Sequence, residues 1–134
     1  MNLFLNCTAH QLNELQMQES KNISGAIRDL NRDNPELFNK LVQAPSEIEE
    51  IQNLLLDFQN YLFSLEALEY SIIYLHFPIG SPFFMALFFK NYSLSNRFQI
   101  LFSHSERISN ETQKEESTIK VSEFQFKKYI PLPC

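Results

Sequence analysis

Glycine is scarce in this sequence, with only Gly25 and Gly80 among 134 residues. A GxxxxGK[ST] phosphate loop or a GxGxxG dinucleotide fingerprint needs glycines in close succession, so neither motif is present. The two cysteines and three histidines form no CxxC, HxxxH or HExxH spacing. That pattern predicts no metal site within one chain, and nothing else in the sequence points to a cofactor.

Long apolar runs are also absent. A membrane-spanning helix needs roughly eighteen or more consecutive apolar residues, and the sequence has no such stretch. We therefore expect no membrane segment. Two cysteines without an export signal are typical of a protein in the reducing cytoplasm, which is the location we expect.

Basic residues are few in the first half of the chain. Residues 1–70 contain four Lys and Arg against eleven Asp and Glu, whereas residues 71–134 contain seven against five. Non-specific affinity for a nucleic-acid duplex comes from many Lys and Arg contacts to phosphates, so we predict that a DNA duplex is not a partner. A small anionic ligand contacting the C-terminal half fits this distribution.

What the chain does contain is enough apolar sequence for one core. The 44% apolar composition over 134 residues predicts a single globular domain spanning residues 1–134. Apolar runs predict strands near residues 3–5, 24–30, 72–75 and 98–102, followed by an antiparallel hairpin that includes residues 119–129 after a charged turn at 114–117. Helices are expected to begin near residues 13, 35, 46 and 82.

Capping signals mark the expected helix starts. Asn13 with Gln16 three residues later matches a capping box, and Ser46 with Glu49 matches a second one. Ser81 precedes a proline and is expected to cap the helix over residues 82–89, which is apolar on nearly every side. A helix of that kind must be buried on more than one side, by the sheet and by a second subunit if one is present.

Strands alternating with helices, followed by a hairpin, predict an α/β fold. We expect a Rossmann-like three-layer sandwich with a mainly parallel sheet, a central strand at 72–75 and a C-terminal antiparallel hairpin. In such sheets ligands bind beyond the carboxyl ends of the strands. Three polar segments are predicted to meet there, namely residues 6–10, 80–83 and 103–107.

These segments and the hairpin supply the candidate site residues. A histidine can donate, accept or transfer a proton, and an arginine can bind phosphate oxygens, so His10 and Arg107 are the candidate catalytic residues. The candidate ligand-binding residues are Asn6, Thr8, Gly80, Ser81, Ser103, Ser105 and Lys128.

Each candidate also has a plain structural interpretation. His10 fits an ordinary surface histidine, and Arg107 fits a surface ion pair with a neighbouring glutamate. The turn at Gly80 fits a simple helix start, and a lysine such as Lys128 on an edge strand protects against aggregation. His76 follows an apolar strand and is expected to be a satisfied histidine of the core.

Several segments together resemble a known family. The run from Thr8 to Gln16 is similar to the opening of the small stand-alone ring nucleases of type III CRISPR systems, the Csx-type proteins related to CARF (CRISPR-associated Rossmann-fold) domains. The family also has a glycine-containing turn before an apolar helix, a hydroxyl/x/Arg pattern and a Phe-x-Phe-basic ending. The corresponding segments here are residues 80–89, 105–107 and 124–129.

The resemblance implies a CARF-like domain that forms a homodimer and binds cyclic tetra-adenylate across its two-fold axis. It further implies metal-independent cleavage, in which a ribose 2′-OH attacks the adjacent phosphodiester and leaves a 2′,3′-cyclic phosphate, so that type III CRISPR signalling is switched off. On this basis His10 transfers a proton or holds the ring, while Arg107 and the helix start at Ser81 hold phosphate.

Two other functions fit the same sequence. The first is a cyclic oligoadenylate-binding protein that sequesters the messenger without cleaving it. The second is an α/β protein-interaction domain whose phenylalanine-rich helix, over residues 83–89, forms a protein interface. Ligand-dependent thermal stabilisation distinguishes the interaction domain from the other two, and turnover distinguishes the nuclease from the sequestering protein.

Overall fold

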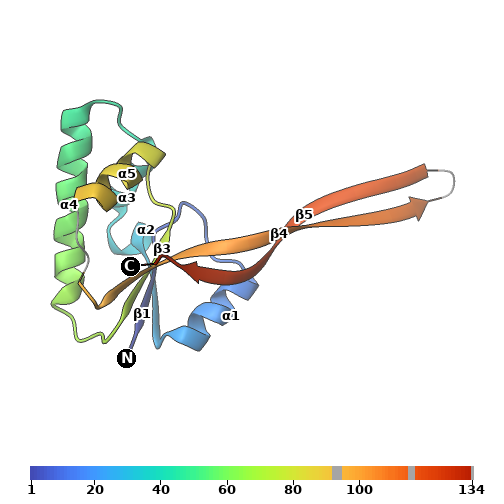
Figure 1. The fold of residues 1–134 in the computed structure, drawn as a ribbon, viewed down its shortest axis with the longest axis horizontal. Helices are drawn as coiled ribbons and strands as arrows, with labels where there is room; N and C mark the ends of the chain where they lie inside the picture. Colours follow the sequence, from blue (N-terminus) through green and yellow to red (C-terminus); the bar gives the residue numbers. More distant parts are fainter. Residues whose placement is uncertain (92–94, 115–116, 134) are drawn as a thin grey trace.

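A computed structural model describes the backbone of residues 1–91, 95–114 and 117–133, and the side chains of the same residues except 108–123 (Figure 1). Five strands and five helices are formed by the described residues. In chain order they are β1 (Leu3–Asn6), α1 (Glu14–Ile23), β2 (Ala26–Asp29), α2 (Leu30–Asp33), α3 (Pro35–Gln43), α4 (Ile48–Glu66), β3 (Ile73–Phe77), α5 (Pro82–Asn91), β4 (Phe98–Lys114) and β5 (Ser117–Pro131).

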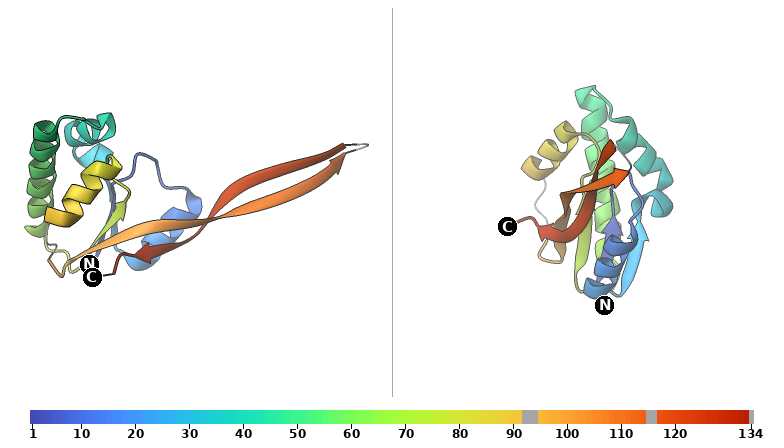
Figure 2. Two further views of the ribbon diagram at one scale, coloured as in Figure 1. Left: turned by 45° about the horizontal axis from the view of Figure 1, so that its top comes forward. Right: turned by 90° about the vertical axis from the view of Figure 1, so that its right-hand side faces the viewer.

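The five strands form one mixed sheet in the order β2-β1-β3-β4-β5. The pairs β1–β2, β1–β3 and β3–β4 are parallel, and β4–β5 is antiparallel. Helix α1 lies on one face of the sheet, and α3, α4 and α5 lie on the other (Figures 1 and 2). This architecture confirms the predicted α/β fold, including the central position of β3. None of the described helices is both long and apolar enough to cross a bilayer.

The main core lies between the sheet and helices α4 and α5. Phe58 of α4 is fully buried, and its ring centroid lies 6.4 Å from that of Phe77, 6.0 Å from that of Phe84 and 5.3 Å from that of Phe88. Burial of one such side chain stabilises the fold by about 1.5 to 3 kcal/mol. The aromatic packing of α4 against β3 and α5 thus holds the carboxyl end of β3 in place.

Helix α5 is less covered than its sequence predicts. Phe84 and Phe88 are buried, but Phe83 is 51% exposed and Phe89 is 39% exposed. The sheet and α4 therefore cover one side of this helix, and part of its apolar surface faces outward.

Most predicted helix starts are confirmed. The Asn13 side chain accepts a hydrogen bond from the backbone N–H of Gln16, and the Gln16 side chain accepts one from Asn13. The prediction of a second capping box is wrong, because α4 begins one residue later than predicted. Glu47 is its N-cap residue, in place of Ser46, and the Glu47 side chain makes no capping hydrogen bond.

Strand β4 is much longer than predicted. It pairs with β3 only from Phe98 to Phe102, and from there to Lys114 its partner in the described chain is β5. The two strands form a twisted ribbon that projects far from the rest of the domain (Figures 1 and 2). The predicted hairpin is confirmed. Residues 115–116 of its predicted turn lie outside the described residues. Residues 103–107, which were expected in a polar segment after the strand, belong to β4 itself.

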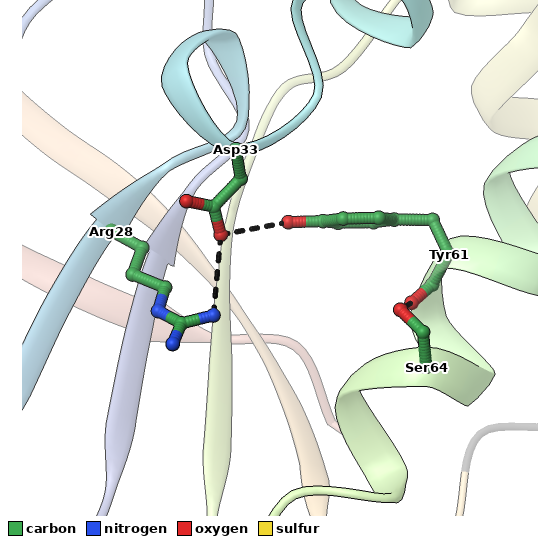
Figure 3. A network of polar contacts seen from close by, with 4 residues as sticks. All are labelled: Arg28, Asp33, Tyr61 and Ser64. Carbon is green, nitrogen blue, oxygen red and sulfur yellow. Dashed lines mark hydrogen bonds and ion pairs between the residues drawn. The ribbon is translucent and has the colours of Figure 1, made fainter.

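A polar network joins the edge of the sheet to α4 (Figure 3). The Arg28 guanidinium lies 3.5 Å from the Asp33 carboxylate, and the Tyr61 hydroxyl donates to the same carboxylate oxygen over 3.1 Å. Burial and the neighbouring Asp33 charge raise the pKa of Tyr61, so its hydroxyl keeps its proton and remains a donor. The network ties β2 and the short α2 to α4, next to the loops at the carboxyl edge of the sheet.

Candidate functional site

A cavity of about 370 Å³ opens at the carboxyl ends of β1 and β3, where β4 leaves β3. Its lining comes from the loop over residues 7–11, the end of β3, Gly80, the inner side of α3 and the segment Phe102–Ser103. Strand β2 lies on one side of β1, and the later strand β3 lies on the other side of β1. The cavity therefore lies where the strand order reverses. That is the usual ligand position in open α/β sheets.

The loop after β1 is built around the side chain of Asn6, which is 2% exposed. Its Nδ2 donates to the His10 carbonyl over 2.8 Å and to Asp29 Oδ1 over 3.1 Å. Its Oδ1 accepts from the Thr8 backbone N–H over 3.2 Å and lies 2.7 Å from the Thr8 hydroxyl oxygen. Asn6 therefore fixes the backbone of residues 8–10 at the mouth of the cavity.

His76 lies at the floor of the cavity and is 2% exposed. Its Nδ1 lies 3.0 Å from Asn6 Oδ1, and its Nε2 lies 2.7 Å from Ser103 Oγ. The amide nitrogen of Asn6 faces two acceptor oxygens, which fixes the orientation of the amide and leaves Oδ1 facing His76. Because Oδ1 can only accept a hydrogen bond, Nδ1 of the imidazole carries the hydrogen. Nε2 is then the acceptor for the Ser103 hydroxyl. Burial lowers the pKa of His76 to about 4, which keeps the ring neutral at neutral pH.

Ser103 connects the floor of the cavity to α1. The Gln16 Nε2 donates to Ser103 Oγ over 3.0 Å. The Tyr129 hydroxyl, opposite Ser103 in the β4–β5 register, donates to the Gln16 carbonyl over 3.0 Å and lies 2.9 Å from the Ser20 hydroxyl. Burial raises the pKa of Tyr129, so its hydroxyl remains protonated. These bonds hold α1 against the root of the hairpin.

Gly80 and Ser81 start α5 beside the cavity. Gly80 lines the cavity and has φ of +62°, in the left-handed region that favours glycine. The Ser81 hydroxyl accepts the backbone N–H of Phe84 over 3.1 Å, as expected of an N-cap residue. Ser81 lies outside the described lining, and its hydroxyl is engaged in the cap.

The structure brings five of the predicted site residues together and separates four others from them. Asn6, Thr8, His10, Gly80 and Ser103 lie in or directly beneath the cavity lining. The ones outside the described lining are Ser81, Ser105, Arg107 and Lys128, and the last three lie on the hairpin.

Arg107 is carried outward because β4 continues past the sheet. Its guanidinium carbon lies 5.4 Å from the ring centroid of Phe124, its partner across the ribbon, and Phe124 is 70% exposed. Arg107 is therefore an exposed cation out on the hairpin, next to an exposed aromatic ring.

The described lining of the cavity contains no Asp, Glu, Lys or Arg. It combines apolar side chains of α3 with the hydroxyls of Thr8 and Ser103, the Gln16 amide and two imidazoles. Such a surface suits an uncharged planar group with hydrogen-bonding edges better than it suits a phosphate. Within the described part of the chain, no three His, Cys, Asp or Glu side chains are grouped so as to hold a metal ion.

Two polar residues that organise this site, His76 and Gln16, were not predicted as site residues. His76 was expected to be a satisfied core residue, which it is, but it also forms the floor of the cavity. Gln16 was predicted to close a capping box, and its Nε2 additionally orients Ser103. A polar residue that ends a buried parallel strand, as His76 does, is a signal that points to the carboxyl edge.

Comparison with known proteins gives one family. The family model described as "Uncharacterized protein MJ1673 family" matches residues 2–130. No curated protein and no solved structure gives a significant match. Because the family model covers nearly the whole sequence, the chain belongs to the MJ1673 family.

Proposed function

We propose that the protein is a homodimeric ring nuclease that binds cyclic tetra-adenylate in the cytoplasm and cleaves it without a metal. In this role it switches off type III CRISPR signalling. The proposal starts from the resemblance of residues 8–16 to the opening of such enzymes. The observation that best supports it is that this segment supplies Thr8, His10 and Gln16 to the cavity at the carboxyl edge of the sheet.

The character of the cavity fits one base of the messenger. Adenine is planar and uncharged, with donors and acceptors on its edges, and the described lining offers apolar surface together with hydroxyl, amide and imidazole groups. The ribose then lies beside the base in the cavity, next to Ser103, and the phosphates at the cavity mouth face the exposed cations Arg107 and Lys128 of the hairpin. A two-fold symmetric ring matches an isologous dimer, which supplies each of these groups twice.

The proposed reaction makes modest demands on the protein. The ribose 2′-oxygen, the phosphorus and the leaving 5′-oxygen must be held in line, and donors must stabilise the charge that develops on phosphorus. Tight seating of the bases in two symmetric cavities provides the alignment. Arg107 supplies a guanidinium for phosphate oxygens, and His10, exposed at the mouth of the cavity, supplies an imidazole near the ring.

The test uses radiolabelled cyclic tetra-adenylate in EDTA, with products separated by chromatography. Linear di-adenylate that ends in a 2′,3′-cyclic phosphate, and one ring bound per two chains, are the expected results. His10→Ala is expected to slow cleavage more than it weakens binding, with His104→Ala as the matched control on the hairpin. Arg107→Ala is expected to weaken binding, and Arg107→Lys, which keeps the charge but loses the bidentate fork, should weaken it less.

The sequestering function is the second candidate, and one observation favours it. The described lining has no cationic side chain to stabilise a phosphorane, so a ring held by its bases alone would be bound but not cleaved. Tight retention of intact messenger without products identifies this function. If the protein neither retains nor cleaves the messenger, both candidates are excluded and the protein-interaction domain remains.

A further inference from the structure

The arrangement of Ser103, His76 and Asn6 goes beyond what packing requires. Ser103 Oγ lies 2.7 Å from His76 Nε2, and His76 Nδ1 lies 3.0 Å from Asn6 Oδ1. This is a hydroxyl next to a base, with the base oriented by a third group, which is the geometry that activates hydroxyl groups in enzymes. Asn6 and His76 come from the carboxyl ends of β1 and β3, and Ser103 from the point where β4 leaves β3, so all three lie at or beneath the cavity.

The hydrogen-bond directions in this arrangement are fixed. Asn6 Nδ2 donates to the His10 carbonyl and to Asp29, so Asn6 Oδ1 must accept from His76 Nδ1. The lone pair of His76 Nε2 therefore faces Ser103, and the Ser103 hydroxyl donates its only proton to it.

The remaining capacity of the Ser103 oxygen points to a ligand. A hydroxyl oxygen has two lone pairs, and the Gln16 amide donates to one of them. The other is free to accept from a donor in the cavity that Ser103 lines. A hydroxyl group placed there would donate to Ser103 and be joined through it to the imidazole.

We propose that Ser103 accepts the proton of the attacking ribose 2′-OH while it passes its own proton to His76. This inference rests on the proposed ring-nuclease function and names the proton acceptor of that reaction. The 2′-oxygen forms a bond to phosphorus as its proton moves to Ser103, and the bond from phosphorus to the 5′-oxygen breaks. The leaving 5′-oxygen takes a proton from solvent, and after product release the proton on His76 returns through Ser103 to water in the cavity, which restores the starting state.

Burial disfavours a positive charge on His76, and its neighbours offset part of that cost while the ring holds the proton. The rings of Phe4 and Tyr129 lie against the imidazole, with centroids 5.6 Å and 5.1 Å from it. Asn6 Oδ1 accepts from Nδ1, and the Asp29 carboxylate lies one hydrogen bond further on. Burial also lowers the pKa of His76 to about 4, so the ring is in its neutral, proton-accepting form near neutral pH. Ser103 is thus the catalytic residue of this proton transfer, beside the roles of His10 and Arg107, and His76 and Asn6 are positioning residues that act through Ser103.

The experiment is single-turnover cleavage of radiolabelled cyclic tetra-adenylate in EDTA from pH 4 to pH 8. Ser103→Ala is expected to slow cleavage about 100-fold, the effect of losing a general base. Binding of the 2′-deoxy ring, which has no attacking hydroxyl, should stay within about threefold, since one neutral hydroxyl contributes little net binding. Ser103→Thr keeps the hydroxyl and should retain most of the rate. Ser64→Ala, at an exposed serine of α4, is the control.

A second variant tests the direction of the hydrogen bond without truncating Ser103. Gln16→Glu keeps a residue suited to the capping box, but its carboxylate accepts from Ser103 where the amide donated. The Ser103 proton then turns away from His76, so cleavage should slow about tenfold or more. The wild-type rate is expected to fall as the pH drops and His76 takes up a proton, and His76→Gln should remove that dependence.

The outcomes separate this inference from the function on which it rests. If the wild-type protein cleaves the ring and both Ser103→Ala and Gln16→Glu cleave it equally fast, the proton transfer is wrong and the proposed function stands. If the wild-type protein does not cleave the ring at all, the proposed function fails and the proton transfer fails with it. A phosphoryl adduct on Ser103, with no cyclic phosphate product, would overturn proton transfer in favour of direct attack by Ser103.

Discussion

Acid should destabilise this protein through a single buried imidazole, that of His76. The folded protein holds the ring neutral, since burial lowers its pKa from 6.5 to about 4. The unfolded chain takes up a proton on the same ring below pH 6.5. The stability associated with the neutral ring is therefore fully present above pH 6.5, begins to fall below it, and is lost by about pH 4.

The size of the effect follows from the difference between the two pKa values. Each unit of difference corresponds to about 1.4 kcal/mol, so His76 accounts for a loss of about 3 kcal/mol over this range. That is a large fraction of the stability of a domain of this size, which is typically about 5 to 15 kcal/mol.

The measurement is the free energy of unfolding in urea at several pH values from 7.5 to 4, for wild type and His76→Gln. Carboxylates titrate in both proteins, so the difference between their pH slopes isolates the imidazole. His104→Gln, which alters a histidine 42% exposed in its side chain, should keep the wild-type slope. Identical pH slopes for wild type and His76→Gln would contradict this prediction and show that the imidazole is accessible to water.

Three further changes test the backbone and the network at the site. Gly80→Ala should destabilise by about 1 to 2 kcal/mol, because a Cβ at φ +62° is strained and would lie 3.1 Å from Phe84; an unchanged urea midpoint would contradict this. Ala44→Gly should stabilise by about 0.5 to 1 kcal/mol, seen as a higher melting temperature, because Ala44 ends α3 with φ of 50°. Asn6→Ala should cost about 2 to 3 kcal/mol in urea unfolding, because it removes the acceptor of the buried His76 imidazole and a donor to the half-buried Asp29 carboxylate.

Local signals in the sequence predicted the helices well. Asn13 with Gln16, Asn34 before Pro35, and Ser81 before Pro82 all mark true helix starts, because a cap depends only on residues three or four positions apart. The wrong prediction of an N-cap at Ser46 also rests on a local pattern. Serine and glutamate stand at the right spacing, but the helix begins after Glu47, so the pattern alone does not decide which residue takes the cap.

The sequence could not show where β4 ends. Hydrophobic patterning reports burial, and beyond Phe102 the strand leaves β3 and pairs only with β5 in the described chain. A two-stranded ribbon buries little, so its residues can be polar and still be fully paired. For that reason Ser103 was placed correctly at the cavity, whereas Arg107, four residues later, lies out on the hairpin.

The polar network of the site is the part that sequence reasoning could least foresee. His76 and Asn6 are 70 residues apart, and they meet because β1 and β3 pair in parallel with these two residues in register. Ser103 joins them through β4, the next strand along. Fold class was predictable from the order of elements, but strand register was not, and register decides which side chains touch.

We propose that the messenger binds in the cavity beside His76 and Ser103. The most direct test is an NMR titration of ¹⁵N-labelled protein with the 2′-deoxy form of cyclic tetra-adenylate, which binds without being cleaved. We predict that the largest shifts occur at the amides of Thr8, Gly80 and Ser103. Shifts confined to the α3–α4 surface around Lys40 and Asp57, or no shifts at a high concentration of the ring, would contradict the claim.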